Sequence, residues 1–270
     1  MIEHPEFENI LQFTSLNDYK CVDHFFTTRN GGVSKGDFST FNLGNFSDDN
    51  PVDIYENRQI LSRMWYMDIN DFIVPHQTHS SNVLIIDEEF QKLNASEKID
   101  ALYGVDATIT HLKHIFLCAT TADCVPILLY DKKRDVIAAI HAGWKGIVNL
   151  IIDNVILKMK DTYQTDPIDI IAVIGPSISE KHYEIGEDVV SIFKKSSFNL
   201  DAASFFNTKT GKLHVDLKKI AHDKLIELGI PSGQIEISNL CTYESADFFF
   251  SARRQSIHCG RMLAGIKLTD

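Results

Sequence analysis

The hydrophobic pattern is clearest in the middle of the chain, where two apolar runs enclose a charged turn. Residues 125–130 and 136–140 are almost entirely apolar, and the segment between them reads Asp-Lys-Lys-Arg-Asp. Short apolar runs on either side of a polar turn are typical of buried strands that pair with each other. The pattern therefore predicts a β-hairpin over residues 125–140.

Helical spacing of apolar residues occurs in three other stretches, which are residues 53–67, 147–163 and 216–228. The last of these has the clearest end signals, because Asp216 can cap its first turn and Gly229 can end it. A fourth helix is expected to begin near residues 186–187.

Further strands are predicted from short apolar runs outside these helices: residues 72–74, 82–86, 107–110, 115–119, 168–174 and 235–238. Hairpins and crossover helices are mixed along the chain, and no linker, repeat or low-complexity tract divides it. We therefore expect an α+β (mixed α/β) fold in which residues 1–270 form a single compact domain, with mixed sheets and flanking helices.

Composition narrows the range of partners. The chain has 270 residues, a formal net charge of −11 and a pI near 5.4, which argues against nucleic acid as the main partner because such binding needs clustered Lys and Arg. A small neutral or singly charged substrate fits better. No signal peptide or apolar run of membrane-spanning length is evident, so we expect a cytoplasmic protein without a membrane partner.

The cysteines are odd in number and widely spaced, with no C-x-x-C pair, so neither a disulfide framework nor a zinc ribbon is predicted. Cys124 is the informative one, because it directly precedes the first strand of the hairpin and His141 ends the second. The register of the hairpin places Cys124 opposite a residue between His141 and Gly143. A thiol and an imidazole are therefore expected to meet where the chain leaves the sheet.

A third ligand is available between two predicted strands, in the segment Pro-His-Gln-Thr-His-Ser of residues 75–80. One of its histidines with Cys124 and His141 would give three protein ligands for Zn²⁺ and leave a fourth position for water or substrate. Zinc lowers the pKa of bound water to about 7 and polarises bound groups. Asp123, beside the cysteine, could orient that water or move a proton.

The residues alone leave other interpretations open. Free cysteines are usually small buried hydrophobic residues and single histidines are usually structural. Alternatively, Cys124 could act as a nucleophile with His141 as its base, which would give a metal-free cysteine hydrolase.

Cations near two loops could bind an anionic cosubstrate. Residues 26–34 end an apolar strand in Gly31-Gly32, for which a hairpin turn is the simplest prediction. That turn does not explain Arg29, whose planar fork of donors suits a phosphate or carboxylate. Arg253, Arg254 and Arg261 offer further cations near the C-terminus, although solvated surface charges are commoner.

Several motifs, taken in order, resemble one family, the laccase-domain family, once called polyphenol oxidases and now described as purine nucleoside phosphorylases. The motifs are Thr27-Thr28-Arg29-x-Gly31-Gly32-Val33-Ser34, Phe41-Asn42-Leu43-Gly44, Gln77-x-His79, Asp106-Ala107, Thr121-Ala122-Asp123-Cys124-x-Pro126, His141-Ala142-Gly143-Trp144-x-Gly146, Gly175-Pro176-Ser177-Ile178 and Phe249-Phe250-Ser251-x-Arg253-Arg254. The resemblance covers nearly the whole chain.

This resemblance implies a single-domain mixed-sheet fold with a metal site formed by His79, Cys124 and His141, where His79 rather than His76 follows the motif glutamine. It implies phosphorolysis of adenosine, inosine, guanosine and methylthioadenosine, and deamination of adenosine. Zinc is the expected cofactor, with copper as a possible substitute, and the substrates are purine nucleosides and phosphate. The candidate catalytic residues are His79, Asp123, Cys124 and His141, and the candidate substrate contacts are Arg29, Asn42, Gln77, Lys145, Arg253 and Arg254.

Departures from the family motifs are modest: Ser80 and Lys145 stand where glycine and arginine are common, and Ala252 and Gln255 replace a tyrosine and an aspartate. These bear on substrate preference more than on metal binding. The sequence does not determine the preferred nucleoside, the metal or the oligomeric state.

Two further alternatives remain. Copper-dependent phenol oxidation by a four-copper centre needs about ten histidines, many in His-x-His pairs. The chain has eleven histidines and no such pair, which argues against that centre. A non-enzymatic partner protein with structural zinc would need a fourth protein ligand.

Overall fold

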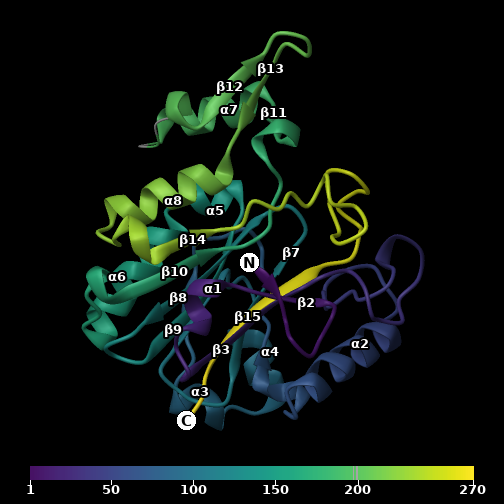
Figure 1. The fold of residues 1–270 in the computed structure, drawn as a ribbon, viewed down its shortest axis with the longest axis vertical. Helices are drawn as coiled ribbons and strands as arrows, with labels where there is room; N and C mark the ends of the chain where they lie inside the picture. Colours follow the sequence, from purple (N-terminus) through teal and green to yellow (C-terminus); the bar gives the residue numbers. More distant parts are fainter. Residues whose placement is uncertain (197, 199) are drawn as a thin grey trace.

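The computed structural model describes residues 1–196, 198 and 200–270. Within these residues, the strands form two six-stranded sheets and one three-stranded sheet (Figure 1). The first sheet has the order β1 (Ile2–Glu3), β2 (Ile10–Gln12), β3 (Val22–Thr27), β15 (Met262–Leu268), β7 (Phe116–Thr121) and β4 (Phe72–Ile73). The C-terminal strand β15 lies between β3 and β7, so both ends of the chain contribute to one sheet.

The second sheet carries the predicted hairpin. Its order is β14 (Ile235–Ile237), β10 (Ile170–Ile174), β8 (Val125–Asp131), β9 (Val136–Ala142), β6 (Ala107–Thr110) and β5 (Val83–Ile85). Strands β8 and β9 pair antiparallel with Asp131 opposite Val136 and Val125 opposite Ala142. Parallel pairs, such as β5 with β6, occur beside antiparallel ones. The predicted hairpin and the mixed-sheet fold are confirmed.

The helices are α1 (Thr14–Asn17), α2 (Pro51–Met64), α3 (Glu88–Lys92), α4 (Ala95–Ala101), α5 (Trp144–Val148), α6 (Ile151–Tyr163), α7 (Glu187–Lys195) and α8 (Leu217–Glu227). Asp216 caps α8, because its side chain accepts from the Lys219 N–H, and Gly229 follows the helix with φ of +99°. Both end signals act as predicted. The fourth predicted helix is α7, which begins after Gly186.

The two large sheets pack face to face, and helices cover their outer faces. Alternate residues of β8, such as Leu128 and Tyr130, face the first sheet, where Phe26 and Leu117 meet them. The intervening residues, such as Ile127, pack against α6 and α8. Helix α2 covers the other face of the first sheet. Strands β8 and β9 are therefore buried on both faces, which explains why they lack polar alternation.

The predicted helix over residues 147–163 is wrong in one respect, because it is interrupted. Helix α5 ends at Val148, Leu150 has φ of +65°, and α6 begins at Ile151. The apolar spacing placed Leu150 on the buried face, but its side chain is 38% exposed. The break lets α5 follow directly from β9 while α6 turns to pack along the sheet.

The hairpin predicted at Gly31-Gly32 is also wrong. Strand β3 pairs with β2 and β15, and after the glycines the chain enters a 3₁₀ helix at Gly36–Phe38. A Cβ atom at Gly32 would lie 2.4 Å from both Asn57 Oδ1 and the Thr40 carbonyl oxygen. A close approach to α2, rather than a hairpin, therefore requires glycine here.

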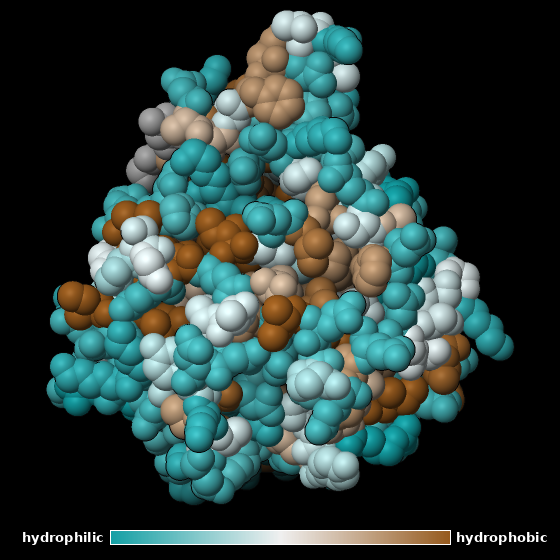
Figure 2. Space-filling view, in the orientation of Figure 1, coloured by the Kyte–Doolittle hydropathy of each residue, from teal (hydrophilic) through white to brown (hydrophobic). Residues whose placement is uncertain are grey.

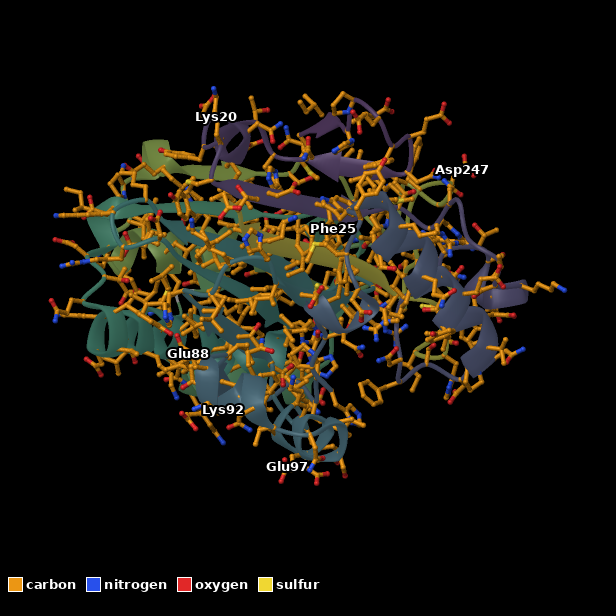
Figure 3. All side chains as sticks on the ribbon, turned by 90° about the horizontal axis from the view of Figure 1, so that it is seen from below. Lys20, Phe25, Glu88, Lys92, Glu97 and Asp247 are labelled. Atoms are coloured by element: carbon orange, nitrogen blue, oxygen red, sulfur yellow. The ribbon has the colours of Figure 1, made fainter. Side chains whose placement is uncertain are left out.

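The remaining elements form a projection at one end of the molecule (Figure 1), where β11 (Glu184–Ile185), β13 (Lys212–Val215) and β12 (Ser204–Asn207) form the third sheet. Figure 2, in the same orientation, shows hydrophobic residues as small patches among hydrophilic ones. Figure 3 shows Phe25 inside the structure while Lys20, Glu88 and Asp247 lie at its edge. No helix of the described residues is long and apolar enough to cross a bilayer.

Candidate metal centre

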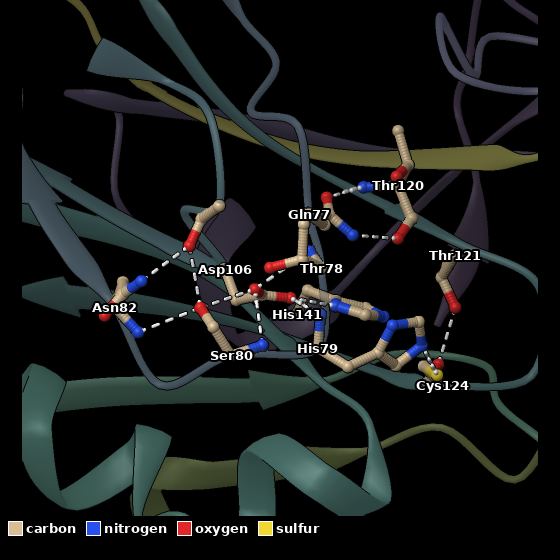
Figure 4. A network of polar contacts seen from close by, with 11 residues as sticks. Gln77, Thr78, His79, Ser80, Asn82, Asp106, Thr120, Thr121, Cys124 and His141 are labelled. Atoms are coloured by element: carbon tan, nitrogen blue, oxygen red, sulfur yellow. Dashed lines mark hydrogen bonds and ion pairs between the residues drawn. The ribbon is translucent and has the colours of Figure 1, made fainter. Parts of the chain in front are cut away.

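His79, Cys124 and His141 come together at one end of the second sheet (Figure 4). Their potential ligand atoms all lie within 4.8 Å of one another, and Cys124 Sγ is 3.7 Å from His79 Nε2. His141 is buried, Cys124 is half-buried and His79 is exposed. The three side chains therefore form a shallow cluster open to solvent on one side.

The hairpin positions two of these side chains. Because Val125 pairs with Ala142, Cys124 lies opposite Gly143, within the range that the sequence predicts. Gly143 leaves space between the candidate ligands: a Cβ atom there would lie 2.8 Å from His79 Cδ2 and 3.0 Å from Cys124 Sγ. Glycine is therefore required by close approach, although its φ of −73° is open to any residue.

His79 is held by a buried aspartate that sequence reasoning did not assign to the site. Asp106, just before β6, accepts hydrogen bonds from the backbone N–H groups of Thr78 (3.1 Å), His79 (3.0 Å) and Ser80 (2.7 Å), and from Ser80 Oγ (2.8 Å). These bonds fix a loop in which His79 has φ of +62°. The only sequence signal for Asp106 was its place in a family motif.

The same aspartate orients His141. Asp106 Oδ1 lies 2.7 Å from His141 Nδ1, so a proton on Nδ1 leaves the Nε2 lone pair available for a metal. Burial alone would raise the pKa of Asp106, but hydrogen bonds from His141 and Ser80 lower it below its usual value. Asp106 therefore stays ionised and holds a proton on Nδ1 of His141.

Electrostatics at the cluster favour a thiolate. Burial opposes ionisation of Cys124, but the neighbouring His141 and His79 outweigh it and lower the pKa of the thiol. Burial opposes protonation of His141, whereas the Cys124 thiolate and Asp106 raise its pKa. A thiolate and two imidazole nitrogens are a donor set that suits Zn²⁺ with one open position. The residues present therefore fit a metal of this kind.

A cavity of about 580 Å³ opens onto the cluster and has a volume suited to a small molecule. Its other lining side chains include the rings of Trp144 and Tyr183 and the cations Arg253 and Arg261. Sequence reasoning assigned no role to either ring. Their positions depend on segments far apart in the chain, so no local pattern marks them.

Asp123 lines this cavity, but its carboxylate is engaged by the C-terminal region. It accepts from Thr242 Oγ1 (2.6 Å), Ser251 Oγ (3.0 Å) and the Arg253 N–H (2.7 Å). Its φ of +94° is strained for a residue with a Cβ atom. The carboxylate thus ties the loop that carries Arg253 to the residue before Cys124.

The other sequence-predicted residues are divided between the cavity and the scaffold. Gln77 lines the cavity, and its amide is paired with the backbone of Thr120, accepting at 2.7 Å and donating at 2.8 Å. Asn42 is fully buried and connects Gly44 and Arg261 through its side-chain oxygen.

The remaining candidate cations lie outside the cavity lining. Arg29 donates to the carbonyl oxygens of Ser39 and Ala246. Arg254 donates to the carbonyl oxygens of residues 242, 243 and 249. Lys145 is exposed on α5. His76 lines the cavity but stacks on Phe46, with ring centroids 3.7 Å apart, rather than joining the metal cluster.

Comparison with known proteins places this arrangement in a family. Residues 23–269 match the family model described as "Multi-copper polyphenol oxidoreductase laccase". The chain belongs to this family. The assignment agrees with the resemblance seen in the motifs and with the position of their cysteine and histidines around one cavity.

Relatives in this family carry enzyme names. A Bacteroides thetaiotaomicron protein named purine nucleoside phosphorylase is 40% identical over 99% of both chains. A protein named adenosine deaminase RL5, from an unknown prokaryotic organism, is 39% identical over 91% of this chain and 93% of its own. The solved structure of the hypothetical protein YfiH from Bacillus licheniformis superposes with a TM-score of 0.89 at 31% identity, covering 98% of each chain.

Proposed function

We propose that this protein is a metal-dependent purine nucleoside phosphorylase that also deaminates adenosine. The observation that carries the proposal is the convergence of His79, Cys124 and His141 on a cavity of about 580 Å³. The names of the relatives that are similar over nearly the whole chain support the same activities. The substrates would be adenosine, inosine, guanosine or methylthioadenosine, with phosphate.

His79, Cys124 and His141 would hold the metal, which we propose to be zinc, with copper able to occupy the same donor set. When bound, zinc would lower the pKa of a water molecule and polarise a purine or carbonyl group near it. Asp106 prepares the site by pairing with His141 Nδ1, which leaves Nε2 as the metal-facing nitrogen, and by holding the His79 loop in place. Gly143 keeps the space between the ligands free.

Phosphate would bind to Arg253 and Arg261, because these cations line the cavity. The guanidinium of Arg253 lies over the Tyr183 ring, 5.3 Å from its centroid, and donates to the carbonyl oxygen of Glu184. These contacts fix its orientation and leave other donors for an anion. The rings of Trp144 and Tyr183 offer flat apolar surfaces for a purine base.

Asp123 is proposed to act on phosphorolysis by placing Arg253, because its carboxylate accepts the Arg253 N–H. Asp123 also lines the cavity beside Cys124. To transfer a proton to the departing ammonia, its carboxylate would have to release one of the donors that it now binds. Gln77, which also lines the cavity, would contact substrate.

The experiment is to incubate zinc-loaded protein with adenosine, with and without phosphate, and to separate the products by chromatography. Adenine that forms only with phosphate, together with inosine, is the expected result. Cys124→Ser should abolish both products, whereas Cys21→Ser, a half-buried thiol outside the cavity, should retain them. Unchanged activity in Cys124→Ser would overturn the assignment.

The phosphate site has its own test. Arg253→Met should raise the KM for phosphate at least about tenfold, because a charge-assisted contact contributes about 1.5–3 kcal/mol. Deamination without phosphate should keep most of its kcat. An equal loss of both activities would assign Arg253 to nucleoside binding or to structure instead.

A cysteine hydrolase is the second candidate, because Cys124, His141 and Asp106 are arranged as a thiolate, an imidazole and an orienting carboxylate. Zinc content and alkylation distinguish the two functions. Stoichiometric zinc that protects Cys124 from iodoacetamide supports the metal enzyme, and full activity after removal of zinc supports the hydrolase.

A further inference from the structure

A second cavity, of about 690 Å³, lies beside the metal-site cavity and is lined by residues of α2, α4 and β4. The two cavities share the wall formed by Asn45, Phe46 and His76. None of the candidate metal ligands lines the second cavity. The proposed nucleoside chemistry therefore leaves this space unexplained.

Arg58 is the unusual residue of the second cavity. It follows the buried Ile54 by one helical turn on α2, so its side chain starts on the face that packs toward the first sheet. Its Nη2 atom is buried and has no hydrogen-bond partner, and within the described residues its guanidinium forms no ion pair. Burial lowers the pKa of Arg58 to about 10.

Arg58 is half-buried, and its buried Nη2 atom is costly, because water does not solvate that atom and no acceptor replaces the lost hydrogen bonds. Arg29 and Arg254 differ from Arg58, because each of them donates to backbone carbonyl oxygens. A planar guanidinium matches a carboxylate in a bidentate pair. An anion bound at Arg58 would therefore supply the missing acceptors.

Charge in the cavity favours an anion. The chain has 37 acidic residues and a net charge of −11, yet no Asp or Glu occurs among the described residues that line this cavity. Its remaining charged side chain is Lys98, at the rim, with Nζ 5.6 Å from the Phe90 ring centroid. The charged side chains that line this cavity are therefore cationic, although the protein as a whole is anionic.

Most of the other residues that line the cavity are apolar. Its walls include Ile54, Phe72, Ile73, Phe90 and Leu93, which form an interior surface suited to a hydrophobic body. At the rim, Tyr55, Ile99 and Tyr103 are 54%, 67% and 66% exposed. Exposed apolar side chains around a hollow are typical of binding sites rather than of ordinary surface.

We propose that this cavity is a second small-molecule site, which binds a carboxylate carried on an aromatic or aliphatic body. The carboxylate pairs with Arg58, and the body lies against the apolar walls between α2 and α4. This site is distinct from the metal centre and does not depend on the proposed nucleoside activity.

The test uses 2-naphthoate and its neutral counterpart 2-naphthamide, with binding followed by titration calorimetry on the full chain. The wild-type protein should bind the carboxylate at least about tenfold more tightly than the amide, because a paired charged hydrogen bond is stronger than a neutral one. Decanoate and decanamide extend the same comparison to a chain-like body. Absence of binding by both carboxylates at millimolar concentration would overturn the proposal.

Variants locate the bound carboxylate. Arg58→Met should weaken naphthoate binding about tenfold or more and leave naphthamide binding unchanged, whereas Arg63→Met, at an exposed arginine of the same helix, should change neither. Cys124→Ser should also bind naphthoate normally, which separates this site from the metal centre. Equal naphthoate affinity in Arg58→Met and wild type would refute the role of Arg58.

A surface variant covers the case in which Arg58→Met does not fold. Ile99→Glu places a negative charge at the exposed rim and should weaken naphthoate binding more than naphthamide binding.

Sedimentation tests whether a second copy of the chain, rather than a small molecule, covers this cavity. A dimer that Tyr103→Glu dissociates would assign this surface to self-association and overturn the small-molecule site.

Discussion

Replacement of Asp106 by asparagine should weaken metal binding more than any other change outside the three candidate ligands. In the native structure, Oδ2 accepts from Thr78 N–H, Ser80 N–H and Ser80 Oγ, and Oδ1 accepts from His79 N–H and His141 Nδ1. Asparagine has one oxygen, so its amide NH₂ must face one of these two sets of donors. The substitution therefore creates a donor facing a donor in a buried position.

The orientation of the amide decides the consequence. If its oxygen remains with the larger set of donors from the Thr78–Ser80 loop, its NH₂ faces His141. The imidazole then accepts at Nδ1 and carries its proton on Nε2, which removes the lone pair intended for the metal. If the amide turns the other way, the loop that carries His79 loses its anchor. Either orientation damages one ligand.

The magnitude follows from the hydrogen bonds that the substitution removes. Charge-assisted hydrogen bonds contribute about 1.5–3 kcal/mol each, and an unsatisfied buried group costs about 1–3 kcal/mol. We therefore expect the free energy of unfolding of Asp106→Asn to fall by about 2–4 kcal/mol. Loss of a group that orients a metal ligand commonly lowers metal affinity by about 10–100-fold, and the same range is expected here.

Two assays separate these effects. Competition with a chromophoric chelator measures zinc affinity, and urea titration measures stability. Asp131→Asn is the matched control, because Asp131 is also a fully buried aspartate of this sheet and accepts from the Lys133 and Arg134 N–H groups. It should lose stability but keep native zinc affinity. Zinc affinity within twofold of wild type in Asp106→Asn would refute the reasoning.

Three further predictions concern other parts of the fold. Gly143→Ala should lower zinc affinity at least about tenfold with little change in fold, because its Cβ would press on His79 and Cys124; unchanged affinity in the chelator assay would contradict this. His24 is buried and burial lowers its pKa to about 4, so the unfolded chain takes up the proton first as pH falls. Stability should therefore decrease by up to about 3 kcal/mol between pH 6.5 and pH 4, and His24→Gln should show a smaller decrease in urea titrations across that window. Gln164 ends α6 with φ of +58° and an exposed side chain, so Gln164→Gly should raise the free energy of unfolding by about 0.5–1 kcal/mol, and a lower melting temperature would argue against this.

Local signals predicted the elements that depend on neighbouring residues. The register of the hairpin can be counted from its turn because β8 and β9 are adjacent in the chain, and this count is enough to place Cys124 near His141. Caps also act within a few residues, which is why the ends of α8 were predictable from Asp216 and Gly229. The break at Leu150 was not, because apolar spacing does not report a single left-handed residue.

The fold also contains a strand that its sequence did not mark. Residues 262–268 lie at the end of the chain and pair with β3 and β7 in the centre of the first sheet. Their partners are more than a hundred residues away, so no short-range pattern records the pairing. Asp123 is likewise more than a hundred residues along the chain from the donors at residues 242–253 that engage its carboxylate.

The amino-acid sequence is enough to establish the class of fold, the hairpin and the motifs that place the chain in its family. Three other features depend on tertiary packing: Asp106 orients His141 and anchors the His79 loop, Arg261 rather than Arg29 lines the metal-site cavity, and Arg58 lies unpaired in a second one. The difference comes from the range of the interactions. Periodicity and capping act between near neighbours, whereas burial, hydrogen-bond partners and charge at a site depend on which distant segments pack together.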